Sequence, residues 1–116
     1  DSAHLYGCDG FTLDKNNPNI IYACFGKYAC NIGGIFKSTD YGKTWVKKYN
    51  TRFGSNQTLR QVGSCIAVDE NNSNVIYCGT RTEGLIISED GGNTWKKIPS
   101  VPKGYQGDAV GCYWDD

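Results

Sequence analysis

Short runs of β-branched and aromatic residues alternate along the chain with clusters of Asn, Asp, Gly and Pro. Runs of this kind, bounded by turn residues, are typical of β-strands, and no stretch shows the 3.6-residue spacing of an amphipathic helix. The pattern predicts eight strands, at about residues 5–13, 20–25, 33–38, 44–49, 62–68, 75–80, 84–88 and 94–98. The segment DAVGCYWDD predicts one more strand, at about 108–115. We therefore expect an all-β fold.

The chain contains an internal repeat. FTLDKNNPNIIYACFG, residues 11–26, aligns with IAVDENNSNVIYCGTR, residues 66–81. GGIFKSTDYGKTWVKKY, residues 33–49, aligns with EGLIISEDGGNTWKKIP, residues 83–99. The offset is 55 residues in the first half of the unit and 50 in the second, so the first copy holds five extra residues within 25–34.

Each copy reads as one four-stranded sheet. We predict a single domain over residues 1–116, made of two repeats at about 5–49 and 62–99 plus the C-terminal strand at about 108–115. A chain of this length buries roughly two-thirds of the surface that its unfolded form exposes, which allows a modest core.

The phrase STDYGKTW, residues 38–45, returns as SEDGGNTW, residues 88–95. It falls between the third and fourth predicted strands of each copy, where a hairpin must turn. Gly can supply the positive φ of such a turn, Asp, Ser and Thr can bond its backbone, and Trp can anchor it. We therefore assign a structural role to Ser38, Asp40, Gly42, Thr44, Trp45, Ser88, Asp90, Gly92, Thr94 and Trp95.

This phrase resembles the Asp-box, also called the bacterial neuraminidase repeat, of sialidases, sortilin-type receptors and xyloglucan-cleaving propeller glycosidases. The longer run IAVDENNSNVIYCGTRTEGLIISEDGGNTWKKI, from residue 66 to 98, is most similar to the blades of the xyloglucanases. The resemblance covers roughly residues 11–49 and 62–98 and implies sheets of the propeller-blade type. It also implies that the box lies on the outside of a blade, away from the ligand face.

Closed propellers use about four to eight blades, whereas this chain offers two. The chain could be a piece of a larger propeller, several copies could complete one ring, or the two sheets could pack face to face. We favour the last arrangement. The predicted fold is therefore all-β, with two four-stranded antiparallel blade-like sheets packed as a disulfide-stapled sandwich.

Six cysteines and no methionine suit an oxidising compartment, so we expect disulfides and a secreted, extracellular protein. Six cysteines allow fifteen pairings, which the sequence leaves open. A metal site is not expected, because there is no C-x-x-C motif and only one histidine, and neither is a cofactor. The expected disulfide residues are Cys8, Cys24, Cys30, Cys65, Cys78 and Cys112.

Twelve basic and twelve acidic residues cancel, so no overall field favours nucleic acid or an anionic membrane as a partner. No apolar run approaches the roughly 20 residues of a membrane span. No charged and apolar leader opens the chain, so we expect any signal peptide to have been removed.

Glycoside hydrolysis needs two carboxylates facing each other across a cleft. Asp14 and Asp69 stand at equivalent strand ends before Asn-rich turns, which explains them as turn residues. The resemblance implies that xyloglucanases draw their two catalytic aspartates from different propellers, so this chain could hold one half at most. A Ser-His-Asp set would have to use His4, near a terminus. We therefore predict no catalytic residue and no enzyme.

Recognition is the remaining hypothesis, because Tyr side chains on loops suit sugar stacking and protein contacts. We expect a non-catalytic extracellular module, most concretely a cohesin-like scaffold repeat that docks a dockerin-like module in a plant-cell-wall-degrading assembly, such as a fungal cellulosome. The alternatives are a module that binds plant-wall glycans and a two-blade fragment of a xyloglucanase-like glycoside hydrolase. We expect a monomeric module of a larger chain. The candidate binding residues are Tyr28, Tyr41, Arg60, Tyr105 and Asp108.

Overall fold

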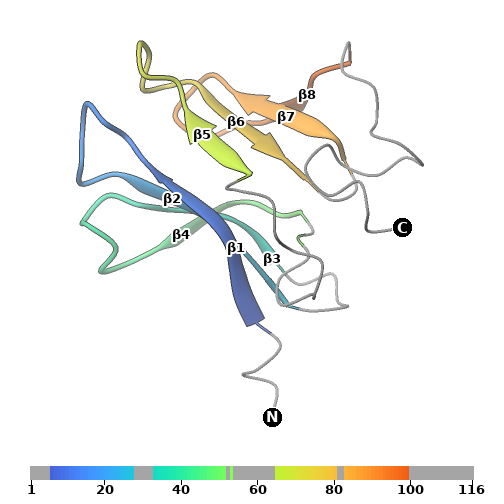
Figure 1. The fold of residues 1–116 in the computed structure, drawn as a ribbon, viewed down its shortest axis with the longest axis horizontal. Helices are drawn as coiled ribbons and strands as arrows, with labels where there is room; N and C mark the ends of the chain where they lie inside the picture. The colour runs from blue at the N-terminus through green and yellow to red at the C-terminus, as the bar shows by residue number, and fades with distance from the viewer. Residues whose placement is uncertain (1–5, 28–32, 52, 54–64, 81–82, 100–116) are drawn as a thin grey trace.

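The computed structural model describes residues 6–27, 33–51, 53, 65–80 and 83–99, and the statements below concern these residues. Eight strands form two four-stranded antiparallel sheets, each in chain order (Figure 1). The first sheet contains β1 (Tyr6–Leu13), β2 (Ile21–Lys27), β3 (Gly33–Ser38) and β4 (Val46–Tyr49). The second contains β5 (Ile66–Val68), β6 (Ile76–Gly79), β7 (Leu85–Ser88) and β8 (Lys96–Lys97).

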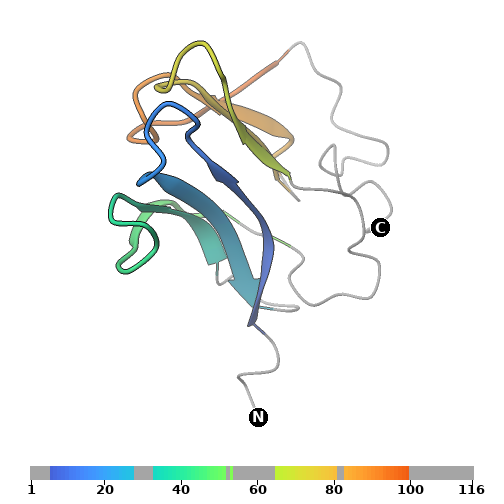
Figure 2. The same ribbon diagram turned by 60° about the vertical axis from the view of Figure 1, so that its left-hand side comes forward.

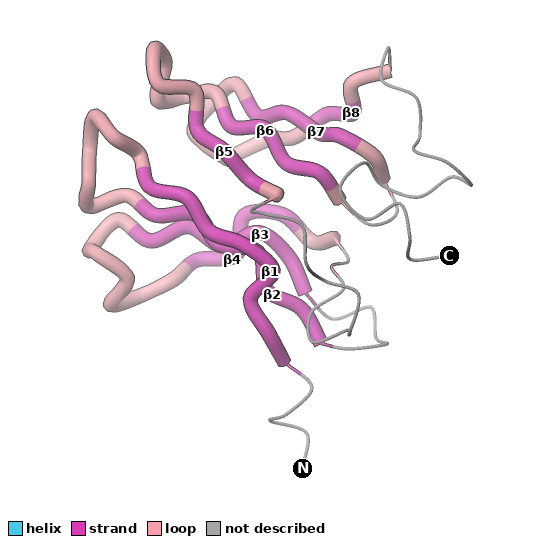
Figure 3. Tube along the Cα trace, viewed as in Figure 1, coloured by secondary structure: helices cyan, strands magenta, loops and turns pink. Residues whose placement is uncertain are grey.

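Strands and loops make up the whole described part of the chain, which contains no helix and therefore none that could span a membrane (Figure 3). The all-β prediction and the prediction of two four-stranded antiparallel sheets are confirmed. The predicted strand at about 108–115 lies outside the described residues.

The two sheets repeat the same pairing register. Ile21 of β2 pairs with Ser38 of β3, and Ile76 of β6 pairs with Ser88 of β7. The sheets lie as two layers with β1 and β5 in contact, as two views of the chain agree (Figures 1 and 2). The repeat therefore produces two copies of one sheet that pack against each other.

The core lies between the sheets. Because side chains alternate between the two faces of a strand, the inner strands β2 and β6 each place every second residue in this space. Tyr22 and Cys24 come from β2, while Ile76 and Cys78 come from β6, and all four are at most 1 % exposed. The full cluster of buried side chains is Tyr22, Cys24, Ile35, Phe53, Ile66, Ile76, Cys78 and Ile86.

The disulfide staple of the predicted sandwich is not supported. Among the four cysteines that the structure describes, which are Cys8, Cys24, Cys65 and Cys78, none is in a disulfide bond. Cys30 and Cys112 lie outside the described residues. Apolar burial and hydrogen bonds between the loops hold the two sheets together instead.

Candidate functional site

The repeated phrase forms a turn whose polar side chains bond one another. The buried Ser38 hydroxyl accepts a hydrogen bond from the Gly42 N–H at 2.8 Å and donates to Asp40 Oδ1 at 2.8 Å. Thr44 donates its N–H and its hydroxyl to the two oxygens of Asp40, at 2.9 and 2.6 Å. The Trp45 indole N–H donates to the Gly42 carbonyl at 3.1 Å. The side chains of Ser38, Asp40, Thr44 and Trp45 thus hold the turn closed.

The second copy repeats these bonds around Ser88 and Asp90. The Thr hydroxyl and the Thr backbone N–H lower the pKa of Asp40 and of Asp90 to about 2. A general acid needs the opposite change, a pKa raised toward neutrality. These carboxylates are therefore suited to accept hydrogen bonds at the turn and unsuited to donate a proton to a substrate.

The second turn also contacts the first sheet. The Gly91 carbonyl accepts hydrogen bonds from the buried Tyr22 hydroxyl at 3.0 Å and from Lys37 Nζ at 2.9 Å. Burial, followed by the charges of nearby carboxylates, raises the pKa of Tyr22 to about 12, so its hydroxyl remains a donor. Tyr41 occupies the place of Gly91 in the first turn, with a φ of 64° and an exposed fraction of 68 %.

Asp14 is a buried carboxylate that joins the loops of the two sheets. It is 1 % exposed and accepts hydrogen bonds from the backbone N–H groups of Asn16 and Asn17 and from the Asn17 amide. The Ser73 hydroxyl of the second sheet donates to it at 2.9 Å. Burial alone would raise the pKa of Asp14, but these hydrogen bonds outweigh it and lower the pKa. Asp14 is thus a fixed acceptor in a structural contact.

A second carboxylate joins the sheets at the other end. Glu83 accepts one hydrogen bond from the Tyr49 hydroxyl and one from the Thr51 hydroxyl, each at 2.6 Å. Burial, with the hydrogen bond and the negative charge of Glu83, raises the pKa of Tyr49 to about 12. The described carboxylates therefore act mainly in turns and in contacts between the sheets.

Each sheet carries a surface pocket beside its repeated turn. The pocket on the second sheet has a volume of about 290 Å³ and is lined by Ile87, Glu89, Asp90, Thr94, Trp95 and Lys96. The pocket on the first sheet has a volume of about 130 Å³ and is lined by Lys37, Thr39, Thr44, Val46 and Lys48. Most of the lining positions are equivalent in the repeat. The pockets are therefore features of the blade rather than a site that one sheet alone has built.

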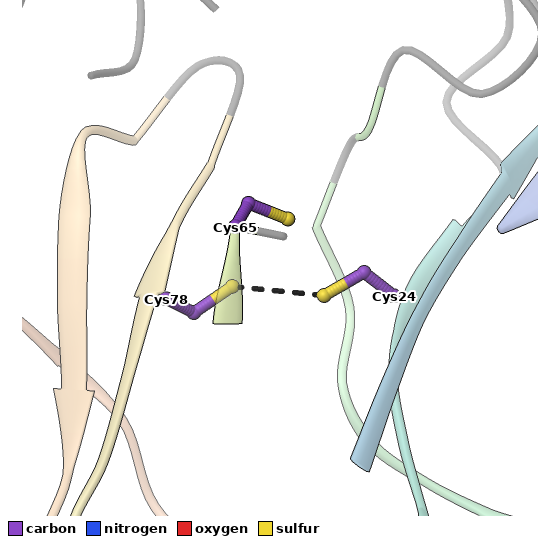
Figure 4. A group of neighbouring side chains, drawn as sticks. All are labelled: Cys24, Cys65 and Cys78. Atoms are coloured by element: carbon purple, nitrogen blue, oxygen red, sulfur yellow. Dashed lines mark hydrogen bonds between the residues drawn. The ribbon is translucent and has the colours of Figure 1, made fainter. Parts of the chain in front are cut away.

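Three cysteines converge between the sheets (Figure 4). Cys24 extends from the first sheet toward Cys65 and Cys78 of the second, and the three sulfurs lie within 4.8 Å of one another. Hydrogen bonds from the Cys24 and Cys78 thiols lower the pKa of Cys65, and the same contacts raise the pKa of Cys24. Three different predicted strands, at about 20–25, 62–68 and 75–80, contain these residues, and nothing in the sequence indicated that all three would meet.

Of the predicted binding residues, the structure describes only Tyr41, which lies exposed at the tip of the first turn. The other four, Tyr28, Arg60, Tyr105 and Asp108, lie outside the described residues, so their role stays a prediction.

Comparison with known proteins identifies what this pair of sheets is similar to. The chain is 34 % identical to the xyloglucanase Xgh74A of Acetivibrio thermocellus and 35 % identical to a xyloglucanase of Hypocrea jecorina. These matches cover 98 % and 96 % of the chain but 15 % of each relative. Its relatives are xyloglucanases.

A solved structure leads to the same group of enzymes. The GH74 xyloglucanase of Xanthomonas campestris superposes with a TM-score of 0.76 at 30 % identity, over 83 % of this chain and 14 % of that enzyme. No protein-family model matches the chain. The chain thus spans about one-seventh of the length of these xyloglucanases.

Two predictions are corrected by these matches. The prediction that the chain is not an enzyme is wrong, because the proteins it matches along nearly its whole length are xyloglucanases. The cohesin-like, cellulosomal and protein-binding interpretation, with its dockerin-like partner, is wrong for the same reason. That interpretation rested on tyrosines in predicted loops and on the lack of a recognisable pair of facing carboxylates, and neither observation distinguishes a docking module from a section of a larger enzyme.

Proposed function

We propose that the chain is a two-blade section of a xyloglucan-degrading glycoside hydrolase. The observation that carries this proposal is the way in which the sheets stack, together with the similarity to xyloglucanases. A plant-wall glycan partner and a secreted setting follow from the same proposal.

The two sheets stack head to tail, with unlike faces in contact. Tyr22 of the first sheet packs in one core cluster with Ile66 and Ile86 of the second. The repeat places Phe11 at the position of Ile66 and Phe36 at the position of Ile86. Phe11 and Phe36 lie in register with Ala23, the neighbour of Tyr22, and therefore on the opposite face of the first sheet. The contact thus joins one face of a blade to the other face of its copy.

This stacking leaves one face of each sheet uncovered: the outer face of the first sheet is of the kind that the second sheet buries, and the outer face of the second sheet is of the kind that the first sheet buries. Ile66 is 3 % exposed in the contact, whereas its equivalent Phe11 is 61 % exposed on the outer face of the first sheet. Val68 packs against the core, whereas its equivalent Leu13 is 48 % exposed. Apolar residues on an outer face indicate a surface that another element covers. A further blade of the same kind fits each end, as in a propeller section.

Hydrolysis of a glycoside requires a pair of facing carboxylates. Asp14, Asp40, Asp90 and Glu83 are held as hydrogen-bond acceptors within turns and between the sheets. We therefore do not expect these four carboxylates to be the catalytic pair. The contribution of this section is to supply two packed blades of the propeller.

A segment exchange tests the proposal. The matching 130-residue segment of Xgh74A is replaced by this chain, and the hybrid is assayed for new reducing ends on xyloglucan. The control is Xgh74A with its own segment reinserted through the same junctions. A folded hybrid that cleaves xyloglucan supports the proposal. A hybrid that fails to fold or to cleave while the control succeeds overturns it.

A further inference from the structure

The three cysteines between the sheets come from positions that the repeat does not relate. Cys24 of β2 aligns with Gly79, Cys78 of β6 aligns with Ala23, and Cys65 immediately precedes β5. The head-to-tail contact alone brings them together, because Cys24 lies on the facing surface of the first sheet and the other two belong to the second. Their convergence is therefore a property of this interface and not a consequence of the duplication.

The thiols occupy one small region of the core. Cys24 and Cys78 are both 0 % exposed, Cys65 is half-buried, and the three sulfurs lie within 4.8 Å of one another (Figure 4). The Sγ atoms of Cys24 and Cys78 are 3.8 Å apart. A disulfide would use two of the three sulfurs and would have to bring them to about 2 Å.

We propose that Cys24, Cys65 and Cys78 bind one Zn²⁺ ion as thiolates and so join the two sheets. Zinc–sulfur bonds of about 2.3 Å place two sulfurs of a tetrahedral site about 3.8 Å apart. The Cys24–Cys78 separation has this value, and Cys65 needs a shift of no more than about 1 Å. The fourth position then belongs to water or to another group on the more exposed side of Cys65.

Charge favours a divalent ion at this place. Each of the three thiols loses its proton to solvent on binding, and three thiolates around Zn²⁺ leave one net negative charge. A monovalent ion such as Cu⁺ would leave two negative charges among Ile35, Ile76 and Ile86, and buried net charge is costly. Soft sulfur ligands select zinc over the hard cations Ca²⁺ and Mg²⁺.

The test uses the full chain, reduced with a phosphine and freed of metal by a chelator. Zn²⁺ is titrated against a chromophoric competitor, and native mass spectrometry gives the stoichiometry. We expect one ion per chain, a higher unfolding temperature with Zn²⁺, and thiolate-to-metal absorption when Co²⁺ replaces it. No binding, or binding of Cu⁺ alone, overturns the proposal.

Single variants locate the site. Cys24→Ser, Cys65→Ser and Cys78→Ser should each weaken Zn²⁺ binding at least tenfold, while Cys8→Ser, outside the cluster, should leave the affinity unchanged. Cys30 and Cys112 remain in every variant. Cys65→Ala serves as a second variant should Cys24→Ser not fold. Undiminished binding in the Cys65 variants, or an equal loss in Cys8→Ser, overturns the assignment, as does recovery of the native chain with a disulfide within the cluster.

Discussion

Tyr22 and Tyr77 stand at equivalent positions of the two sheets, yet Tyr22 is 1 % exposed and Tyr77 is 39 % exposed. The difference arises because the face that carries Tyr22 packs against the second sheet, whereas no further sheet covers the same face of the second sheet within the described residues. The repeat therefore supplies its own matched controls, since a buried position in one copy has an exposed equivalent in the other.

Tyr22→Phe removes the hydrogen bond that the hydroxyl donates to the Gly91 carbonyl. Lys37 still donates to that carbonyl, so we expect a loss of about 1 kcal/mol in the free energy of unfolding. Tyr77→Phe, at the exposed equivalent, should change stability by less than about 0.5 kcal/mol. Urea unfolding of the two variants measures the difference, and equal effects would contradict the assigned packing.

Ile66→Ala should lower the free energy of unfolding by about 2–4 kcal/mol, because the 3 %-exposed side chain lies in the core. Phe11→Ala should cost less than about 1 kcal/mol in the isolated chain, where Phe11 is 61 % exposed. In the hybrid xyloglucanase, Phe11→Ala should lower the free energy of unfolding by more than it does in the isolated chain, because the next blade should cover Phe11. A Phe11→Ala cost in the hybrid as small as in the isolated chain would argue against a covering blade.

Asp14→Ala removes the carboxylate that accepts hydrogen bonds from the Asn16 N–H and the Ser73 hydroxyl, while the Asn17 N–H keeps the backbone carbonyl of residue 14 as an acceptor. We expect a loss of about 1.5–3 kcal/mol, because hydrogen bonds to a charged group contribute more than neutral ones and Asp14 is 1 % exposed. Asp69→Ala, at the equivalent and more exposed position, removes one backbone bond from Asn71 and should cost about 1 kcal/mol or less. Thermal unfolding compares the two, and a larger effect at Asp69 would exclude the role given to Asp14.

Asp40 and Asp90 make the chain sensitive to acid. Their pKa values of about 2 lie below the ordinary value of 3.8, so their contribution to stability is complete above about pH 4. That contribution is lost as the pH falls from about 4 to 2. The double variant Asp40→Asn, Asp90→Asn should therefore show a shallower loss of stability over this range.

Urea midpoints measured from pH 2 to pH 7 follow this loss. Glu89→Gln is the control, because Glu89 forms an exposed ion pair with Lys96 and lies outside the turn bonds. If stability falls as steeply between about pH 4 and 2 in the double variant as in the parent chain, other carboxylates control the acid sensitivity.

The alternation of turn residues and β-formers predicted all eight strands, and the structure confirms them. The errors fall at particular places. β4 begins at Val46 and β8 at Lys96, two residues later than predicted. Thr and Trp have high strand propensity. However, Thr44 and Trp45 are hydrogen-bonded to Asp40 and Gly42 within the turn. Side-chain bonding at the turn thus overrode strand propensity.

The meeting of the two sheets could not be predicted from local pattern. Period-two alternation puts Tyr22 and Cys24 on one face of β2, but it does not say which face of the other sheet they meet. Composition indicated disulfides, whereas Cys24, Cys65 and Cys78 lie together as thiols. The cohesin-like interpretation was wrong, whereas the alternative of a two-blade fragment of a xyloglucanase-like glycoside hydrolase is the one that the similarities favour.

A stack in which one face of a unit matches the other face of the next stops growing only where it closes into a ring. In the isolated chain, the outer face of the second sheet, which carries Tyr77, can pack against the outer face of the first sheet, which carries Phe11, of a neighbouring molecule. That neighbour still has its own Tyr77 face open for a further molecule. Concentrated solutions should therefore contain a series of oligomers of increasing size rather than a single dimer. Tyr77→Lys places a charge on one of the two contact faces of every molecule, so this variant should remain a monomer.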